Sequence, residues 1–409
     1  MQRNAADGLF TKSSLLIISI IKVHDIQIIY LPNPPTCFIS KLNHYIILSG
    51  RYIMHHLFAT KKGLFSVGLC IGIAAALLQK LGNPANMGIC VACFERDIAG
   101  ALGFHRAEVV QYIRPEIMGF VLGSLCAALI FKEYRARAGS APIVRFLLGF
   151  FAMVGALVFL GCPWRALLRL AGGDGNALLG LLGLVAGVWV DVLFLQTGYD
   201  LGRNHKTYAS VGFIMPVMML GLLILLILSP TLPSGALFLS TKGPGSQHAP
   251  LIISLSLGMA IGFLAQRTRF CTMGAIRDFI LIRDFHLMTG VIGLILGAFF
   301  TNLILNQFHP GFTGQPVAHT SHLWSFGGMV LAGLAFALAG GCPGRQLFLS
   351  GEGDGDAAIF IIGMIAGAAF AHNFATASTP QGPAPWGPAF VIIGLISCSI
   401  IGFTMRKKI

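Results

Sequence analysis

The chain has 409 residues, 55% of them hydrophobic and 11% charged, with a mean hydropathy of +0.78 and a net charge of +13. Such a composition excludes an ordinary soluble domain. The positive charge lies in short segments beside apolar stretches, which is typical of topology signals in membrane proteins and argues against a nucleic-acid-binding surface. Strand-like alternation of polar and apolar residues is absent, so we expect an all-α polytopic membrane protein.

The first 53 residues do not fit the pattern of the rest of the chain. They lack the small-residue cleavage site of a signal peptide, and their apolar run 15–21 is too short to cross a bilayer. We interpret residues 1–53 as an over-extended gene start or a poorly ordered tail, with Met54 as the natural start.

About ten apolar stretches of membrane-spanning length follow. They cover residues 64–81, 112–131, 145–161, 177–196, 211–229, 250–266, 287–306, 326–340, 357–375 and 388–405. The loop 132–145 is basic, whereas the loops 307–325 and 376–388 contain no Lys or Arg. Because basic loops stay on the cytoplasmic side, we predict a multi-pass protein of the cell inner (plasma) membrane with both termini in the cytoplasm.

The sequence repeats itself at a spacing of about 180 residues. The recurring motif residues are Cys90 and Cys271, Arg96 and Arg277, Asp97 and Asp278, Cys162 and Cys342, and Arg165 and Arg345. Each copy holds about five spans, an odd number, so the second copy enters the membrane from the opposite side. We therefore predict a 5+5 inverted repeat, with residues 54–232 as membrane repeat 1 and 233–409 as membrane repeat 2.

Short polar segments interrupt the spans at residues 86–105, 163–175, 271–286 and 343–356. In two of them a proline directly follows the motif cysteine, and proline ends the preceding helix and is favoured in the first turn of a new one. We predict short broken or re-entrant helices that begin beside the thiols. A helix N-terminus attracts anions and favours a thiolate.

The cysteines fall into two groups. Those at repeated motif positions, which we predict to line a substrate path, are Cys90, Cys162, Cys271 and Cys342. Cys93 forms a C-x-x-C with Cys90 that fits a redox or metal pair, but its counterpart in the second copy is Gly274. A metal site requires four convergent ligands, so no metal is expected. Cys70, Cys126 and Cys398 stand alone in apolar spans, and we interpret them as small core residues.

The motif arginines are candidates for binding an anion, because a guanidinium group binds oxyanions through two hydrogen bonds. They are Arg96, Arg165, Arg277 and Arg345. For Arg96 and Arg277, an internal salt bridge with the following aspartate is an equally good interpretation. The Gly-Asp-Gly segments 173–175 and 353–355 are expected to be tight turns that cap the next helix.

Residues 60–405 resemble the YeeE/YedE family of sulfur-transport membrane proteins, through the Gly-Cys-Pro-x-Arg and Cys-x5-Arg-Asp motifs. The segments 87–97 and 160–170 are most similar to the YedE-related branch linked to selenium metabolism. The resemblance implies that thiosulfate passes along a line of cysteines through an hourglass-shaped pore. By position, the matching thiols here are Cys90, Cys162, Cys271 and Cys342. The resemblance also implies a small cytoplasmic TusA-like sulfur-carrier protein as a partner. Cys93 departs from this scheme.

These observations predict a permease, not an enzyme, that imports a small sulfur or selenium compound such as thiosulfate. The sequence has no G-x-x-x-x-G-K-[ST] loop, so we expect no nucleotide bound by this chain, no other cofactor and no nucleic-acid partner. The main alternative is a membrane-embedded thiol oxidoreductase that uses Cys90 and Cys93. A second alternative is a structural or partner-binding membrane subunit, for which single cysteine changes would have little effect.

Overall fold

The computed structural model describes residues 20–23, 26–29, 58–231, 233 and 235–407. The chain divides into two units, Met1–His56 and Leu57–Ile409. In the first unit, the described residues form an antiparallel pair of strands, β1 (Ile20–Val23) and β2 (Ile26–Ile29). The rest of the predicted extension 1–53 and the predicted start at Met54 lie outside the described residues.

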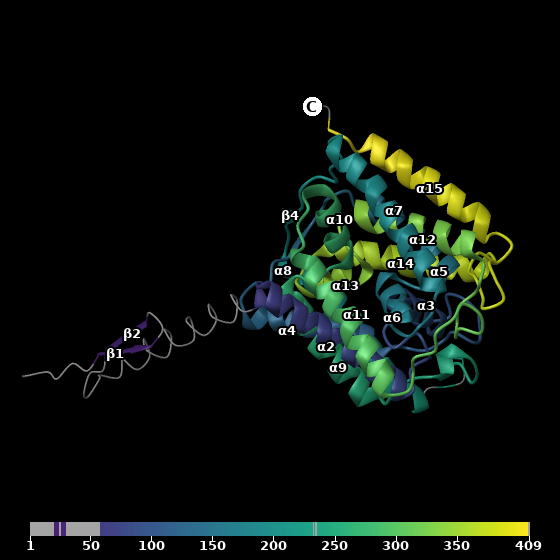
Figure 1. Cartoon of the computed structure of the whole chain (residues 1–409), viewed down its shortest axis with the longest axis horizontal. Coiled ribbons are helices and arrows are strands. Elements are labelled where there is room, and N and C mark those ends of the chain that lie inside the picture. The colour runs from purple at the N-terminus through teal and green to yellow at the C-terminus, as the bar shows by residue number, and fades with distance from the viewer. Residues whose placement is uncertain (1–19, 24–25, 30–57, 232, 234, 408–409) are drawn as a thin grey trace, which may run out of the picture. The chain divides into compact units, whose positions relative to one another are not determined.

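The second unit is helical, as predicted (Figure 1). Its first half contains α2 (Lys61–Lys80), α3 (Val91–Ala101), α4 (Pro115–Ile130), α5 (Pro142–Phe159), α6 (Pro163–Ala171), α7 (Asn176–Gln196) and α8 (Ala209–Leu228). Its second half contains α9 (Leu251–Thr268), α10 (Thr272–Ile282), α11 (His286–Ile304), α12 (His322–Leu338), α13 (Pro343–Gly351), α14 (Gly355–Asn373) and α15 (Gly387–Thr404). Short 3-10 turns and a two-residue strand pair, β3 (Arg137–Ala138) with β4 (His205–Lys206), complete this unit.

The helices have the length and the surface of a membrane protein. Nine helical stretches among the described residues are long and apolar enough to cross a bilayer. The remaining predicted span, residues 112–131, corresponds to α4. At 16 residues, this helix is shorter than the roughly 20 residues that a perpendicular crossing requires. Large apolar side chains remain exposed on the outer helix faces, for example Ile143 at 76% and Ile304 at 78%. Such exposure would be unfavourable in water but suits contact with lipid, so the prediction of an all-α polytopic membrane protein is confirmed.

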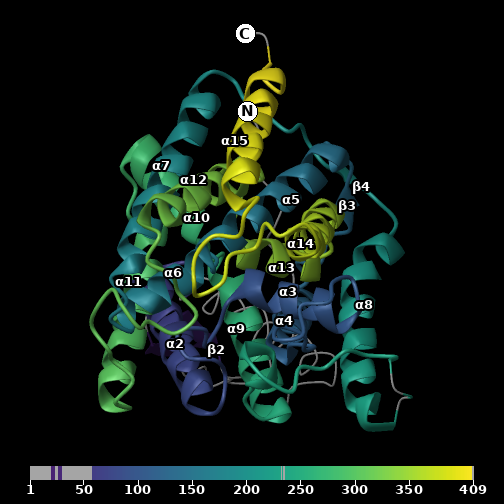
Figure 2. The same ribbon diagram turned by 90° about the vertical axis from the view of Figure 1, so that its right-hand side faces the viewer.

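Helix packing in the second unit has an approximate two-fold pattern. Helix α2 packs on α11, and the equivalent helix α9 packs on α4; likewise α7 packs on α12, and α14 packs on α5. Helices α5 and α12, which are themselves equivalent, contact each other. The last helix of each half departs from this pattern, because α8 packs on α4 and α13 whereas α15 packs on α12 and α5 (Figure 2). This packing is what two repeats would produce, while the inverted arrangement and the repeat boundaries stay predictions.

Glycines allow the main helix pairs to approach closely. A Cβ atom on Gly68 of α2 would lie 1.9 Å from the carbonyl oxygen of Gly290 in α11. In the equivalent pair, a Cβ atom on Gly262 of α9 would lie 2.3 Å from the Phe120 carbonyl oxygen in α4. Small residues at such crossings bring helix backbones into contact in lipid, where apolar burial gives little driving force between helices. The glycine-rich composition therefore contributes directly to this packing.

The two Gly-Asp-Gly segments are tight turns before the next helix, as predicted. Gly173 and Gly353 have φ values of +97° and +98°, which a residue with a Cβ atom rarely adopts. The Asp354 side chain caps α14 by accepting a hydrogen bond from the Ala357 N–H at 3.1 Å. Each turn also bonds to a loop of the opposite half, since Gly311 N–H donates to Gly173 and Arg137 N–H donates to Gly353. The two halves are therefore joined by main-chain contacts as well as by helix packing.

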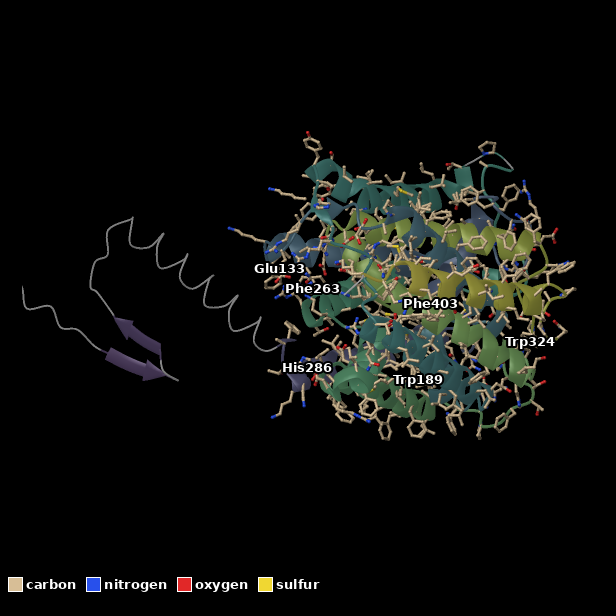
Figure 3. All side chains as sticks on the ribbon, turned by 90° about the horizontal axis from the view of Figure 1, so that it is seen from above. Glu133, Trp189, Phe263, His286, Trp324 and Phe403 are labelled. Atoms are coloured by element: carbon tan, nitrogen blue, oxygen red, sulfur yellow. The ribbon has the colours of Figure 1, made fainter. Side chains whose placement is uncertain are left out.

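The predicted topology is testable by chemical labelling. Figure 3 shows Glu133 and Trp324 at opposite ends of the helical unit, so the loops beside them lie on opposite sides of the helices. In a variant freed of other reactive thiols, Ser321→Cys is expected to react with an impermeant maleimide added to intact cells. Arg135→Cys, in the basic loop, is expected to react only after lysis, because positive loops are retained inside. The reverse labelling pattern would show that the predicted orientation is wrong.

Candidate functional site

Two of the motif cysteines mark points where a helix stops and a shorter one begins. Helix α5 ends at Phe159, and Leu160 turns the chain with a φ of +65°. Cys162 then precedes α6, whose first residue is Pro163. In the second half Cys342 precedes α13, which begins with Pro343. The predicted breaks at the Gly-Cys-Pro segments are confirmed, with each earlier helix ending before the cysteine. The proline suits the start of the next helix, because a first-turn N–H has no partner within the helix.

The other two motif cysteines cap the remaining short helices. Cys90 precedes α3, and its sulfur accepts a hydrogen bond from the Cys93 N–H at 3.3 Å. Cys271 precedes α10, and its sulfur accepts from the Gly274 N–H, also at 3.3 Å. The two copies therefore hold these thiols in the same way. In each case the sulfur occupies the position in which a capping oxygen usually satisfies a free N–H group.

Folding brings the motif cysteines together in two pairs. The Cys90 thiol interacts with the Cys162 thiol, and the Cys271 thiol interacts with the Cys342 thiol. All four cysteines are buried, and none of them forms a disulfide. We call these the first and the second thiol pair. At each pair the N-termini of two short helices meet, so two sets of helix dipoles favour negative charge at the sulfur atoms.

Arg165 and Cys93 lie beside the first thiol pair. The Arg165 side chain is completely buried, and its Nη1 lies 3.3 Å from the sulfur of Cys93. Main-chain carbonyl groups hold the rest of the guanidinium, with Nε donating to Asn86 at 2.9 Å and Nη2 donating to Val317 at 3.0 Å. The first copy therefore places Arg165 beside a group of three thiols, Cys90, Cys93 and Cys162. No group of three or more His, Cys, Asp or Glu in the described part of the chain is arranged to hold a metal ion.

The four candidate arginines differ in how their charge is compensated. Arg96 forms an ion pair with Asp97 at 2.6 Å, Arg277 with Asp278 at 2.8 Å, and Arg345 with Glu352 at 3.4 Å. The salt-bridge interpretation of Arg96 and Arg277 therefore agrees with their geometry. Among the residues that the structure describes, Arg165 has no carboxylate partner and is held by carbonyl groups and a thiol. Arg165 is thus the arginine with charge available for a substrate.

Arg165 and Arg345 differ in having a carboxylate partner because of the residue seven positions later in the chain. Glu352 follows Arg345, whereas Gly172 follows Arg165. A Cβ atom at Gly172 would lie 2.9 Å from the Asn86 side-chain oxygen, so a larger residue there would require the Asn86 side chain to shift. The structure therefore leaves the buried cation of the first copy without the acid that its counterpart has.

Glu352 also belongs to a wider network at the end of the protein that carries the loop 132–145. It pairs with Arg269 at 3.3 Å, and Arg269 in turn pairs with Glu133 at 3.4 Å. Burial alone would raise the pKa of Glu133, but hydrogen bonds from Arg267 and Gln266 and the nearby guanidinium charges lower it below its usual value. This carboxylate therefore stays ionised and stabilises the basic loops. Arg345 is part of that structural network.

The structure corrects the interpretation of two other cysteines. Cys70 and Cys126 are exposed and do not belong to the core, whereas Cys398 is buried as expected. The first two lie on faces of α2 and α4 that no other helix of the described chain covers. An apolar sequence does not distinguish a lipid-facing side from a packed side, which is why the sequence interpretation was wrong there.

Trp164, which directly follows Cys162 and Pro163, is a further candidate that was not predicted from the sequence. The side chain is fully buried, and its Nε1 has no hydrogen-bond partner among the described residues. Its counterpart in the second copy is Gly344. A mismatch between tryptophan and glycine within an otherwise repeated motif was the available signal.

A comparison with protein families identifies part of the chain. Residues 267–395 match the model of a family described as Sulphur transport. The matched segment contains the second thiol pair with Arg277 and Arg345, and over these residues it confirms the resemblance to sulfur-transport proteins. The similarity to the selenium-linked branch stays a prediction. No curated protein matches the chain closely.

Proposed function

We propose that this chain, whose residues 267–395 belong to the sulphur-transport family, imports a small sulfur or selenium compound through its two thiol pairs. The family match and the membrane-spanning helices support a multi-pass transporter of a sulfur compound. The finer assignment covers thiosulfate or a selenium species as substrate and a cysteine-lined path that contains Cys90, Cys93, Cys162, Cys271 and Cys342. No catalytic step is required of the chain.

The observation that carries this proposal is the environment of Arg165. A buried cation without a carboxylate is unfavourable because its lost hydration is not repaid by an opposite charge. An arriving anion supplies that charge. Four of the five guanidinium N–H groups already donate within the protein, which leaves one Nη2 N–H for an anion oxygen. The neighbouring thiols of Cys90, Cys93 and Cys162 are soft groups that suit a sulfur or selenium atom. An anion with both oxygen and sulfur atoms, such as thiosulfate, matches both kinds of group.

The route across the membrane follows from the predicted inverted repeat. With both termini in the cytoplasm of an inner-membrane protein, the first thiol pair lies toward the outside and the second toward the inside. The anion then passes from the first pair to the second between the two repeats, residues 54–232 and 233–409. At the inner face, the partner that the family resemblance implies is a small TusA-like sulfur carrier.

Uptake measurements test the proposal directly. Cells whose own sulfur and selenium uptake systems are deleted would express the full chain and receive labelled thiosulfate or labelled selenite. We expect uptake of at least one compound above that of cells with an empty vector, at matched growth. An absence of uptake for both compounds, with the chain present in the membrane, would contradict the proposed function.

The alternative of a thiol oxidoreductase has one supporting observation, the hydrogen bond from the Cys93 N–H to the Cys90 sulfur. A catalytic C-x-x-C requires both thiols to form and break a disulfide. A transporter requires Cys93 only as one of several soft groups, so Cys93→Ser should retain a substantial part of the uptake. If Cys93→Ser and Cys90→Ser remove all activity while Cys271→Ser is harmless, the oxidoreductase assignment replaces the transporter.

A further inference from the structure

Trp164 contacts residues that adjoin the second thiol pair, although it belongs to the helix that begins beside the first. It belongs to α6 of the first half, two positions after Cys162, but its ring reaches into the second half. A Cβ atom on Gly344, two positions after Cys342, would lie 3.1 Å from Cζ2 of the Trp164 ring. The same ring packs edge-on against Phe270, the residue before Cys271, with ring centroids 5.5 Å apart. One side chain beside the first thiol pair therefore contacts the chain neighbours of both thiols in the second.

The contact between the halves is aromatic and tightly filled. Phe120 and Phe348 complete the cluster around Trp164, with ring centroids 6.0 Å and 6.1 Å from the indole. The counterpart position carries Gly344, and a side chain there would meet the Trp164 ring itself. The two repeats thus share one large side chain at this point, where exact symmetry would require two.

The indole N–H of Trp164 is a donor without an acceptor. The residue is fully buried, and Nε1 forms no hydrogen bond within the described residues. An indole N–H can only donate, and an unpaired buried donor is unfavourable. An oxyanion that moves between the thiol pairs would supply the missing acceptor, and Arg165 follows Trp164 directly in the chain.

We propose that the Trp164 ring separates the two thiol pairs and that its indole N–H donates a hydrogen bond to the sulfur oxyanion as the anion passes from the first pair to the second. This inference rests on the proposed transport function and adds a residue that determines passage and specificity.

A conservative substitution tests the donor role. Trp164→Phe keeps an aromatic ring but removes the N–H, so we expect the thiosulfate concentration for half-maximal uptake to rise about tenfold with membrane abundance retained, since the lost bond is to a charged group. Trp189→Phe is the matched control, because Trp189 is exposed on α7, and it should behave as the native chain. Equal uptake kinetics for Trp164→Phe and the native chain would refute the donor role.

Fluorescence gives a readout that is independent of uptake. The chain has four tryptophans, so Trp189→Phe, Trp324→Phe and Trp386→Phe together leave Trp164 as the single emitter in the purified full-length protein. Sodium thiosulfate is expected to shift or quench its emission in a saturable way, whereas sodium chloride at equal ionic strength does not. If this variant takes up thiosulfate but its emission is unchanged by saturating thiosulfate, the anion does not contact Trp164.

Removal of the ring tests the separating role. Trp164→Gly places in the first copy the residue that the second copy already has. An impermeant maleimide added to one face of the membrane, in intact cells and then in inverted vesicles, should label the more distant thiol pair several-fold faster than in the native chain, as measured by mass spectrometry. An unchanged labelling rate would show that Trp164 does not separate the pairs.

The outcomes distinguish this inference from the proposed function. If the native chain takes up neither thiosulfate nor selenite, the proposed function and the role of Trp164 fail together. If the native chain transports normally while the Trp164 variants show native affinity, silent emission and unchanged labelling, only the role of Trp164 fails. Should Trp164→Phe not insert into the membrane, the emission of Trp164 in the triple variant decides the donor role.

Discussion

Serine at Cys90, Cys271 or Cys342 is expected to abolish most uptake of labelled thiosulfate, and Cys162→Ser is expected to come close to this. The structure places these cysteines as two pairs at the N-termini of the short helices. A substrate that moves between the pairs needs a soft group at each, and serine is a harder group that cannot imitate thiol chemistry. The measurement is the initial uptake rate at matched membrane abundance.

The cysteines outside the thiol pairs serve as controls for this series. Cys70 and Cys126 are exposed on outer helix faces, and Cys398 is buried away from the motifs in α15. Serine at any of these positions should change uptake little beyond any loss of abundance. If serine at motif and control positions has the same small effect, the proposed path through the thiol pairs is wrong.

Arg165→Lys is expected to raise the thiosulfate concentration for half-maximal uptake at least tenfold, while the maximal rate changes less. Lysine keeps the charge but loses the planar donors that hold an oxyanion, and hydrogen bonds to charged groups are each worth about 1.5–3 kcal/mol. The informative change is to lysine, because Arg165→Ala would remove the charge together with the donors to the carbonyl groups of Asn86 and Val317. Uptake kinetics over a range of thiosulfate concentrations provide the measurement.

Two arginines give matched comparisons for Arg165. Arg345→Lys should have a smaller effect, because Glu352 already compensates the charge of Arg345. Arg106 is exposed and stacks on Phe238, so Arg106→Ala should leave uptake unchanged. If Arg165→Lys retains native affinity in a normally inserted protein, Arg165 does not bind the anion. An equal loss from Arg165→Lys and Arg345→Lys would instead place an anion site in each repeat.

The positions of the short helices could be predicted because their signals are local. A proline is disfavoured in a helix interior and favoured in the first turn of a helix, and α6 and α13 begin at the proline of Gly-Cys-Pro. The length of apolar stretches likewise predicted the long helices, with α4 the shortest of them. In both cases the physical cause acts over a few neighbouring residues.

The surroundings of the arginines could not be predicted in the same way. Arg165 and Arg345 stand in the same motif, yet one has no carboxylate partner among the described residues and the other pairs with Glu352. The steric contact between position 172 and Asn86 comes from a segment about 85 residues earlier in the chain. The repeated motif therefore predicted the candidate arginines but not which of them lacks a carboxylate partner.

The sequence by itself determined the membrane character, the helix breaks and the duplicated cysteines, because hydropathy, proline and repetition are properties of the chain that need no partner. Only the tertiary structure decided that the four thiols form two pairs, that Arg165 lies against Cys93 and that the Trp164 ring reaches the second half. These features depend on side chains distant in sequence that meet when the helices pack. Close packing fixes such contacts, and no pattern along the chain contains that information.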